Sequence, residues 1–224
     1  MGNYNWDWSI VSIYWKAFGS GILNSLFISA SAIIIGSILG FILLYFMVFP
    51  KYKIVKICLG WTVEILLAIP LLVLLVWIYY CMPILFNIKI SALQTCIIAM
   101  SINLAPFVSE TLRAGLDSIP KGYTEAGIAL GIPKRKIVRN ILIPQVFSEM
   151  LPALITQYIT LFKLSSLASV IAVNEILHTA NNIISETYRP LEVFTVVALI
   201  YIVIVIPISK LSRQFEIKDG LTKK

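Results

Sequence analysis

The sequence predicts an all-α membrane protein with about five transmembrane helices, and the composition is the first reason. Of the 224 residues, 59% are hydrophobic and only 13% are charged, with a mean hydropathy of +0.91. Soluble domains carry about 25% charged residues, so a lipid bilayer is the expected surrounding. The net charge of +7 could indicate nucleic acid, but the basic residues lie between the apolar runs. That position favours a membrane surface, so we expect membrane lipid and no nucleic acid as a partner.

The second reason is a series of apolar runs of sufficient length, since a transmembrane helix needs roughly 20 mostly apolar residues. Residues 1–20 are aromatic with few charges, which predicts an interfacial N-terminal segment. We expect a transmembrane domain at residues 21–212 and a cytoplasmic tail at residues 213–224. The fourth run contains Lys163 and is compatible with a span, a re-entrant pair or a broken helix. The expected spans are Ile22–Val48, Ile65–Ile88, Ile90–Ser109, Met150–Asn174 and Val193–Ser209.

The third reason is the distribution of basic residues, which also predicts the orientation. Fourteen of the 18 Lys and Arg residues fall after the first run, after the third run or in the C-terminal tail. Cytoplasmic segments carry an excess of Lys and Arg. We therefore expect the N-terminus outside and the C-terminus in the cytoplasm, which agrees with an odd number of spans.

One long hydrophilic connection, residues 110–145, is punctuated as two short helices. Thr124 can cap the first helix, and Gly131 can end it about two turns later. Pro133 can open a second, basic helix, and Pro144 marks the return into the membrane. A helix of two turns is not stable alone in water, so the first helix is expected to dock on another surface through its small residues.

The motif within this connection resembles the EAA loop of ABC-importer permeases. That loop reads Glu-Ala-Ala, three residues, Gly, nine residues and then Ile-x-Leu-Pro. The spacing agrees here from Glu125 to Pro144, with Gly127 and Ile143 as replacements. In the family this loop forms the coupling helix, which seats in a cleft of the partner ATPase. The resemblance implies that role for Glu125, Ala126, Gly127 and Gly131, with Pro144 closing the motif.

The resemblance covers roughly residues 18–217 and points to the polar amino acid branch of these permeases. The segment Lys163-Leu164-Ser165-Ser166-Leu167 looks like the branch's Lys-x-Thr/Ser-Ser-Leu segment. A permease subunit of the bacterial cytoplasmic (inner) membrane is implied, importing an amino acid by alternating access. The implied partners are an ATP-binding cassette ATPase dimer, a second permease subunit and an extracytoplasmic solute-binding protein.

No catalytic or cofactor-binding role is expected of this chain. It contains no Gly-x-x-x-x-Gly-Lys-Ser/Thr loop, so ATP and magnesium are expected on the partner ATPase. His178 is the only histidine, and the three cysteines lack the spacing of metal ligands. We therefore expect no metal site, no cofactor and no enzymatic activity in this chain.

One departure from the branch bears on the second subunit. The branch usually has Arg-Gly-Thr-Pro in the second span, whereas Leu67, Ala68 and Ile69 precede Pro70 here. The chain thus lacks polar groups that family members carry. We therefore favour a heterodimer, in which the other permease subunit holds most substrate contacts, over a homodimer.

Polar residues at bilayer depth are candidates for the substrate path, because such residues are costly there. Lys163 could line the path beside Ser165 and Ser166, where a broken helix would expose backbone donors; alternatively, Lys163 pairs with a carboxylate or snorkels to the interface. Asn103 could bind a zwitterion, although helix–helix contacts are the commoner use. Glu64 is the fifth candidate, with an interfacial position as its alternative.

Two further interpretations complete the set. Glu110 and Arg113 lie three residues apart at the inner end of the third span and are expected to form a structural pin beneath the coupling helix. Lys163 with Ser165 or Ser166 could superficially serve an intramembrane hydrolase, but no supporting triad or carboxylate pair is evident. An importer of another small polar solute, or a non-transporting assembly subunit that docks an ATPase, also remains open.

Overall fold

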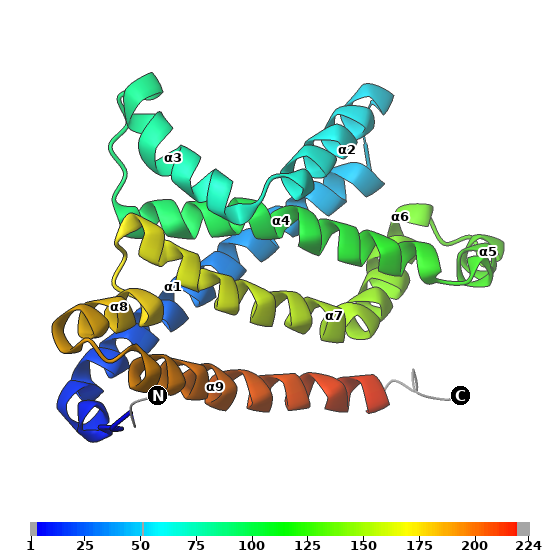
Figure 1. Ribbon diagram of the computed structural model, residues 1–224. Coiled ribbons are helices and arrows are strands. Elements are labelled where there is room, and N and C mark those ends of the chain that lie inside the picture. The colour runs from blue at the N-terminus through cyan, green and yellow to red at the C-terminus, as the bar shows by residue number, and fades with distance from the viewer. Residues whose placement is uncertain (1–3, 51, 219–224) are drawn as a thin grey trace.

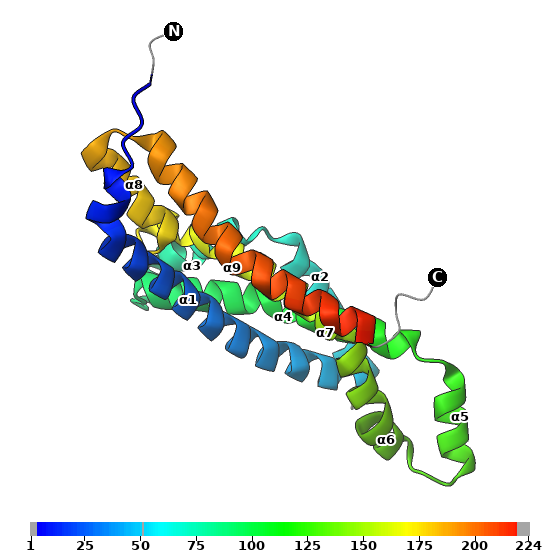
Figure 2. The same ribbon diagram turned by 90° about the horizontal axis from the view of Figure 1, so that it is seen from below.

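The computed structural model describes residues 4–50 and 52–218, and every regular element within these ranges is a helix. The helices α5 and α6 lie at one end of the molecule, and α8 lies at the opposite end with the start of α1 (Figures 1 and 2). Predictions for Met1–Asn3, Lys51 and residues 219–224, which include part of the basic tail, fall outside the described residues. The elements are α1 (Ser9–Val48), α2 (Lys53–Ala68), α3 (Leu71–Phe86), α4 (Ala92–Ser118), α5 (Lys121–Ala129), α6 (Lys134–Ile137), the π-helix η1 (Val138–Leu142), α7 (Ile143–Leu164), the 3₁₀-helix η2 (Ser165–Ile171), α8 (Ile176–Thr187) and α9 (Pro190–Lys218).

The longest helix, α1, packs closely along α4. It begins at Ser9, so much of the expected interfacial segment continues without a break into the first span. Glycines on its α4 side make this approach possible. A Cβ atom at Gly36 would lie 3.0 Å from the Cβ of Leu104, and one at Gly40 would lie 2.8 Å from the carbonyl oxygen of Ala105. Small residues at this spacing let two membrane helices approach to backbone contact.

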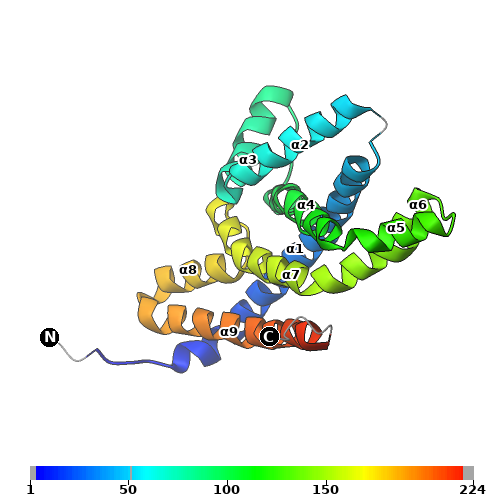
Figure 3. The ribbon, with the colours of Figure 1, turned by 90° about the vertical axis from the view of Figure 1, so that its right-hand side faces the viewer.

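The second expected span, Ile65–Ile88, is wrong in form because the chain bends by 97° between α2 and α3. Ile69 and Pro70 occupy the bend, and both have non-helical ψ angles, 119° and 137°. Proline has no N–H to donate and disfavours a helical conformation of the residue before it. The two helices therefore form a broken span or a re-entrant loop, and they diverge visibly in Figure 3.

The fourth span is continuous with the second half of the hydrophilic connection. α6, η1, α7 and η2 follow one another directly, and Lys134–Ile171 forms one candidate span of 38 residues. The expected irregularity is a change from α-helix to 3₁₀-helix at Ser165. The hydrophilic connection is consequently shorter than residues 110–145, since α4 continues to Ser118 and α6 begins at Lys134.

The helix count agrees with the prediction of about five spans. Within the described residues, four helices are long and apolar enough to cross a membrane, or five if the bent pair α2–α3 is one span. The third span, Ile90–Ser109, lies largely in α4, and the fifth, Val193–Ser209, lies within α9. The orientation across the membrane remains a prediction from the basic residues. The sequence analysis did not predict α8, which packs with α1 and α9 around Ile176, Ala180 and Val193.

Candidate functional site

The short helix expected in the hydrophilic connection is present as α5, but it starts earlier than predicted. Pro120 adopts an extended conformation (ψ 134°) and the helix begins at Lys121, so the prediction that Thr124 caps it is wrong. Proline fixes φ near the helical value and needs no N–H partner, which suits it to this boundary. Glu125 therefore lies within the helix rather than in its first turn, and its side chain is exposed.

The C-terminal end of α5 confirms the predicted stop at Gly131. This residue has φ +72°, a conformation open to glycine without strain. The N–H of Gly131 donates to the carbonyl of Ile128 at 2.9 Å, and the N–H of Ile132 donates to that of Gly127 at 3.0 Å. This pair of hydrogen bonds is a Schellman motif, which satisfies carbonyls left free at a helix end.

The helix docks, as expected, through a small residue. Gly127 is the buried residue of α5, and a Cβ atom there would lie 2.6 Å from Cδ1 of Ile137 in α6. Ile137 is fully buried and packs with Val138 and Leu142 of η1. The third position of the motif is therefore glycine because the side chain of Ile137 occupies the space that an alanine methyl group would need.

The rest of this short helix is largely open. Ala126 is exposed beside Glu125, and the exposed fractions of Ile128 and of Leu130, the residue that follows the helix, are 57% and 78%. Exposed aliphatic side chains near a carboxylate, at the tip of the molecule, form a surface suited to another protein. We name Glu125, Ala126, Ile128 and Leu130 the tip surface.

Pro144 does not interrupt the helix but lies in the first turn of α7. The π-helical turn η1 precedes it, and the N–H of Ile143 donates to the carbonyl of Val138 in the π-helical pattern. Because Pro144 has no N–H, the carbonyl one turn earlier cannot receive an α-helical hydrogen bond from it. The wider π turn lets the helix continue past this position.

The predicted ion pair at the end of α4 is present. Arg113 donates through Nη2 to Oε2 of Glu110 at 2.6 Å and through Nε to Oε1 at 3.1 Å. Both side chains are partly exposed. The pair is a local (i, i+3) contact on α4, and its role as a pin beneath α5 remains a prediction.

The predicted substrate-path residues are not brought together. Asn103 lines a cavity of about 340 Å³, whereas Lys163 and Glu64 are exposed outside that lining. The hydroxyl groups of Ser165 and Ser166 donate to the carbonyls of Phe162 and Lys163, at 2.7 and 2.9 Å. Both hydroxyl groups therefore hydrogen-bond to carbonyl groups of their own helical segment rather than lining a substrate path.

Two residues that the sequence analysis missed share the cavity with Asn103. Gln157 and Thr160 of α7 line it, together with the apolar bend between α2 and α3. Their spacing of three residues places them on one face of a helix, so a search for polar pairs within the fourth run could have found them. Asn103, Gln157 and Thr160 are the polar residues of this cavity.

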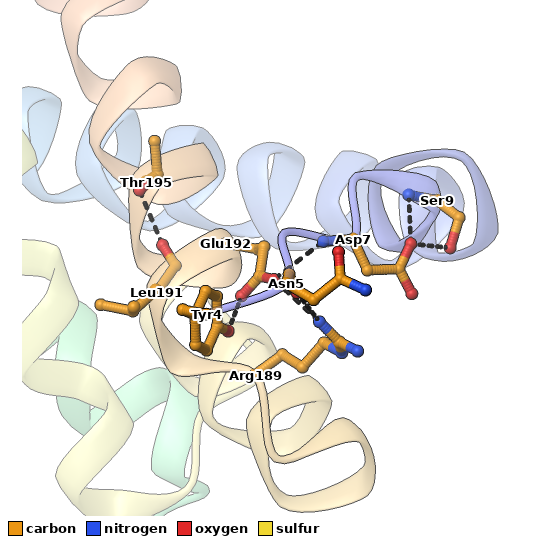
Figure 4. Close-up of polar contacts among 8 residues, drawn as sticks. All are labelled: Tyr4, Asn5, Asp7, Ser9, Arg189, Leu191, Glu192 and Thr195. Carbon is orange, nitrogen blue, oxygen red and sulfur yellow. Dashed lines mark hydrogen bonds and ion pairs between the residues drawn. The ribbon is translucent and has the colours of Figure 1, made fainter. Parts of the chain in front are cut away.

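A second missed cluster joins the N-terminal segment to Arg189 and Glu192 (Figure 4). Glu192 is completely buried, and its carboxylate accepts hydrogen bonds from the Tyr4 hydroxyl, the Asp7 N–H at 3.0 Å and Arg189 Nη1 at 3.1 Å. The hydrogen bond with Glu192 raises the pKa of Arg189 and that of Tyr4. Arg189 also donates to the carbonyl of Asn5 at 2.8 Å. The cluster fastens the N-terminal segment to the start of α9.

Glu175 is a further buried acid, and it explains why α8 begins where it does. Its carboxylate accepts from the N–H groups of Leu177 and His178 at 2.9 and 2.7 Å, the geometry of an N-cap. Burial raises the pKa of Glu175 to about 7, although these hydrogen bonds oppose the change. A glutamate is not among the preferred capping residues, which is why the sequence analysis missed this helix.

These features define a polytopic helical membrane protein with a small polar cavity among its spans and a docked helix at one tip. The chain belongs to the family of binding-protein-dependent transport system inner membrane components, whose profile matches residues 32–216. It is therefore a transport subunit of the inner membrane, a permease of the ABC importer type.

Curated relatives cover nearly the whole chain. The chain is 31% identical over 201 residues to the arginine transport system permease protein ArtQ of Bacillus subtilis (strain 168), covering 88% of this chain and 91% of that protein. It is 29% identical over 214 residues to the glutamine transport system permease protein GlnP of Escherichia coli (strain K12), covering 94% and 96% respectively.

Solved structures agree with this assignment. A chain in the crystal structure of an amino acid ABC transporter with histidines superposes with a TM-score of 0.89 and 31% identity, covering 96% of this chain and 100% of that chain. A chain of the inward-facing MetNI methionine ABC transporter has the same fold, with a TM-score of 0.75 at 22% identity, covering 95% and 99%.

Proposed function

We propose that this permease subunit moves a polar amino acid across the inner membrane by alternating access, driven by a separate ATPase dimer. A solute-binding protein would deliver the amino acid at the end of the molecule that carries α8. The relatives named for arginine and glutamine transport support the substrate class. The chain's own contribution would be half of the pathway and half of the coupling surface.

The tip surface supports the part of this proposal that concerns coupling to the ATPase. A short helix that buries Gly127 and leaves Ile128 and the adjoining Leu130 exposed offers apolar side chains that a partner can cover. Glu125 adds a charge that can specify the register of docking. A displacement of α5 would pass through the contact of Gly127 with Ile137 into the continuous helix Lys134–Ile171.

The cavity supports a heterodimer as the working assembly. Its polar side chains come from α4 and α7, whereas the side that α2 and α3 provide is apolar, with Leu67, Ile69 and Leu72. A zwitterion with a polar side chain needs more hydrogen-bonding partners than this half offers, because unpaired polar groups are costly in a dry site. We propose that a different permease subunit supplies the remaining ones.

The test is the ATPase rate of the reconstituted complex across a panel of amino acids, with the wild-type chain and with Glu125→Lys. We expect one amino acid with its binding protein to stimulate hydrolysis, and Glu125→Lys to abolish the stimulation. Asp117→Lys makes the same charge change at an exposed position of α4, outside the tip surface and far from the end that carries α8, and serves as the matched control. It should leave the stimulation intact.

The outcomes separate the parts of the proposal. If no amino acid stimulates hydrolysis but Glu125→Lys still releases the ATPase, the coupling role stands and the substrate class fails. If an ATPase docks at α5 and no solute of any class stimulates it, the chain is an assembly subunit rather than a transporter. Normal transport by a complex that contains this permease subunit alone would contradict the heterodimer.

A further inference from the structure

A second cavity, separate from the polar one, opens at the end of the membrane domain nearest α5 and α6. It lies between the last turns of α1 and α4 and the first turns of α7, with a volume of about 160 Å³. Among its ten lining residues the one polar side-chain group is the hydroxyl of Tyr45. An apolar cavity of about 150 Å³ stays dry and takes an apolar molecule, so hydrocarbon is the occupant that this cavity favours.

The position of the cavity gives hydrocarbon a route to it. Its mouth is flanked by side chains on the outside of the bundle, where Phe41, Tyr45 and Phe147 are 40–47% exposed. The rings of Phe41 and Phe147 lie 6.2 Å apart and bring α1 and α7 into contact there. In a membrane these exposed rings face acyl chains, so one chain can enter laterally without crossing water.

A cluster of cations lies beside the mouth of this cavity. Nη2 of Arg135 lies 3.5 Å from the hydroxyl of Tyr45 and donates to it. Lys134 and Lys136 flank Arg135 in the sequence, Arg139 lies one turn further on, and all four side chains are exposed. The ion pairs among the described side chains use Arg113 and Arg189 as cations, so these four have no carboxylate partner within that part of the chain. We name them the basic cluster.

We propose that this cavity and the basic cluster together bind an anionic phospholipid, with a short stretch of one acyl chain in the cavity and the phosphate on Arg135. A guanidinium group matches the geometry of phosphate oxygens and can donate two hydrogen bonds to them. Four cations near the mouth favour a lipid with a net negative charge over a zwitterionic one. The hydroxyl of Tyr45 marks the level at which hydrocarbon gives way to the headgroup.

Occupancy of this site has a consequence for the tip surface. Arg135 lies two residues from Ile137, whose side chain supports α5 at Gly127. A lipid phosphate bound at Arg135 would therefore hold α6 against the end of α1 and stiffen the support of the coupling helix. This consequence rests on the proposed function, whereas lipid binding itself does not.

The test is native mass spectrometry of the purified full-length chain with its copurifying partners, titrated with the phosphatidylglycerol POPG or the phosphatidylcholine POPC. The wild type should retain POPG in preference to POPC. Arg135→Gln should lower the POPG affinity roughly tenfold, as expected for a lost charge-assisted contact. Lys16→Gln removes one exposed charge at the other end of α1 and should change nothing.

A second variant addresses the cavity rather than the charge. Ile143→Trp places a large ring in the lining at a position that is already 39% exposed, so the fold should tolerate it. It should reduce retention of both lipids, and equal thermal midpoints of the two variants and the wild type would exclude unfolding. Equal retention of POPG and POPC by the wild type would overturn the proposal. Loss of POPG in Arg135→Gln without any loss in Ile143→Trp would also overturn it, because the lipid would then lie on the surface.

Discussion

Replacement of Gly40 by alanine tests whether α1 and α4 are in direct backbone contact. The added Cβ atom would lie 2.7 Å from Cβ of Val108 and 2.8 Å from the carbonyl oxygen of Ala105. A side-chain tip could turn away, but the carbonyl oxygen belongs to the backbone of α4 and moves only with that helix. Gly40→Ala must therefore push the two helices apart or leave strained contacts.

Gly19 offers a matched control in the same helix, because nothing lies within 4 Å of the position of its Cβ atom. Both substitutions gain the same intrinsic helix propensity, up to about 1 kcal/mol, so this gain cancels in the comparison. Overpacking of a well-packed contact costs about 1–3 kcal/mol. For a chain of this length, 1 kcal/mol corresponds to about 2–4 °C in Tm. Gly40→Ala should therefore melt about 2–12 °C below Gly19→Ala.

The assay is thermal unfolding of the two purified variants in the same detergent, followed by circular dichroism. Gly36→Ala should fall between them, because its contacts are looser at 3.0 Å. If Gly40→Ala were as stable as Gly19→Ala, the close packing of α1 on α4 would be refuted. The interpretation of Gly36 and Gly40 as a packing motif would fail with it.

Three other predictions concern the ends of the molecule. The pKa of Glu175, about 7, lies above its ordinary value of 4.5. The wild type should therefore lose stability as the pH rises from 4.5 to 7, by about 3 kcal/mol at most. Glu175→Gln should flatten this pH dependence of Tm. Gly131→Ala should strain the φ of +72° by about 1 kcal/mol or more, which predicts roughly fivefold faster hydrogen exchange at the Ile132 N–H; an unchanged rate would contradict the Schellman motif. Tyr4→Phe should remove one of the hydrogen bonds that hold the N-terminal segment at Glu192 and speed proteolysis of that segment, whereas Ser12→Ala, which disturbs only a local contact, should not.

The sequence predicted those features that depend on local rules. The third and fifth spans follow from apolar length, and both were confirmed. Gly131 ends its helix because a left-handed residue is needed there, and Pro133 precedes the next helix as expected. The ion pair of Glu110 with Arg113 follows from their (i, i+3) spacing. In each case the relevant atoms lie within a few residues of one another.

The failures concern features that depend on distant contacts and, at the start of α5, on a competing local signal. Pro70 permits the bend of 97°, but the two diverging helices pack on α4, and hydropathy alone reads the same residues as one span. Thr124 could have capped a helix, but Pro120 starts one earlier. Only the packing of α4 on α7 reveals that Asn103 shares a cavity with Gln157 and Thr160 rather than with Lys163.

The helix continues from Lys134 to Ile171, so a displacement at one end can be passed to the other. A flexible loop between α6 and α7 would change its own conformation when the tip moves, and it would not pass the displacement on. Here 38 residues form one continuous helical segment, about 57 Å along the contour at 1.5 Å per residue. That length exceeds the roughly 30 Å hydrocarbon core. In the proposed importer, a displacement of α5 at one membrane face would be passed through this helix to η2 near the other face. Any loss of displacement would arise in the short connection between α5 and α6.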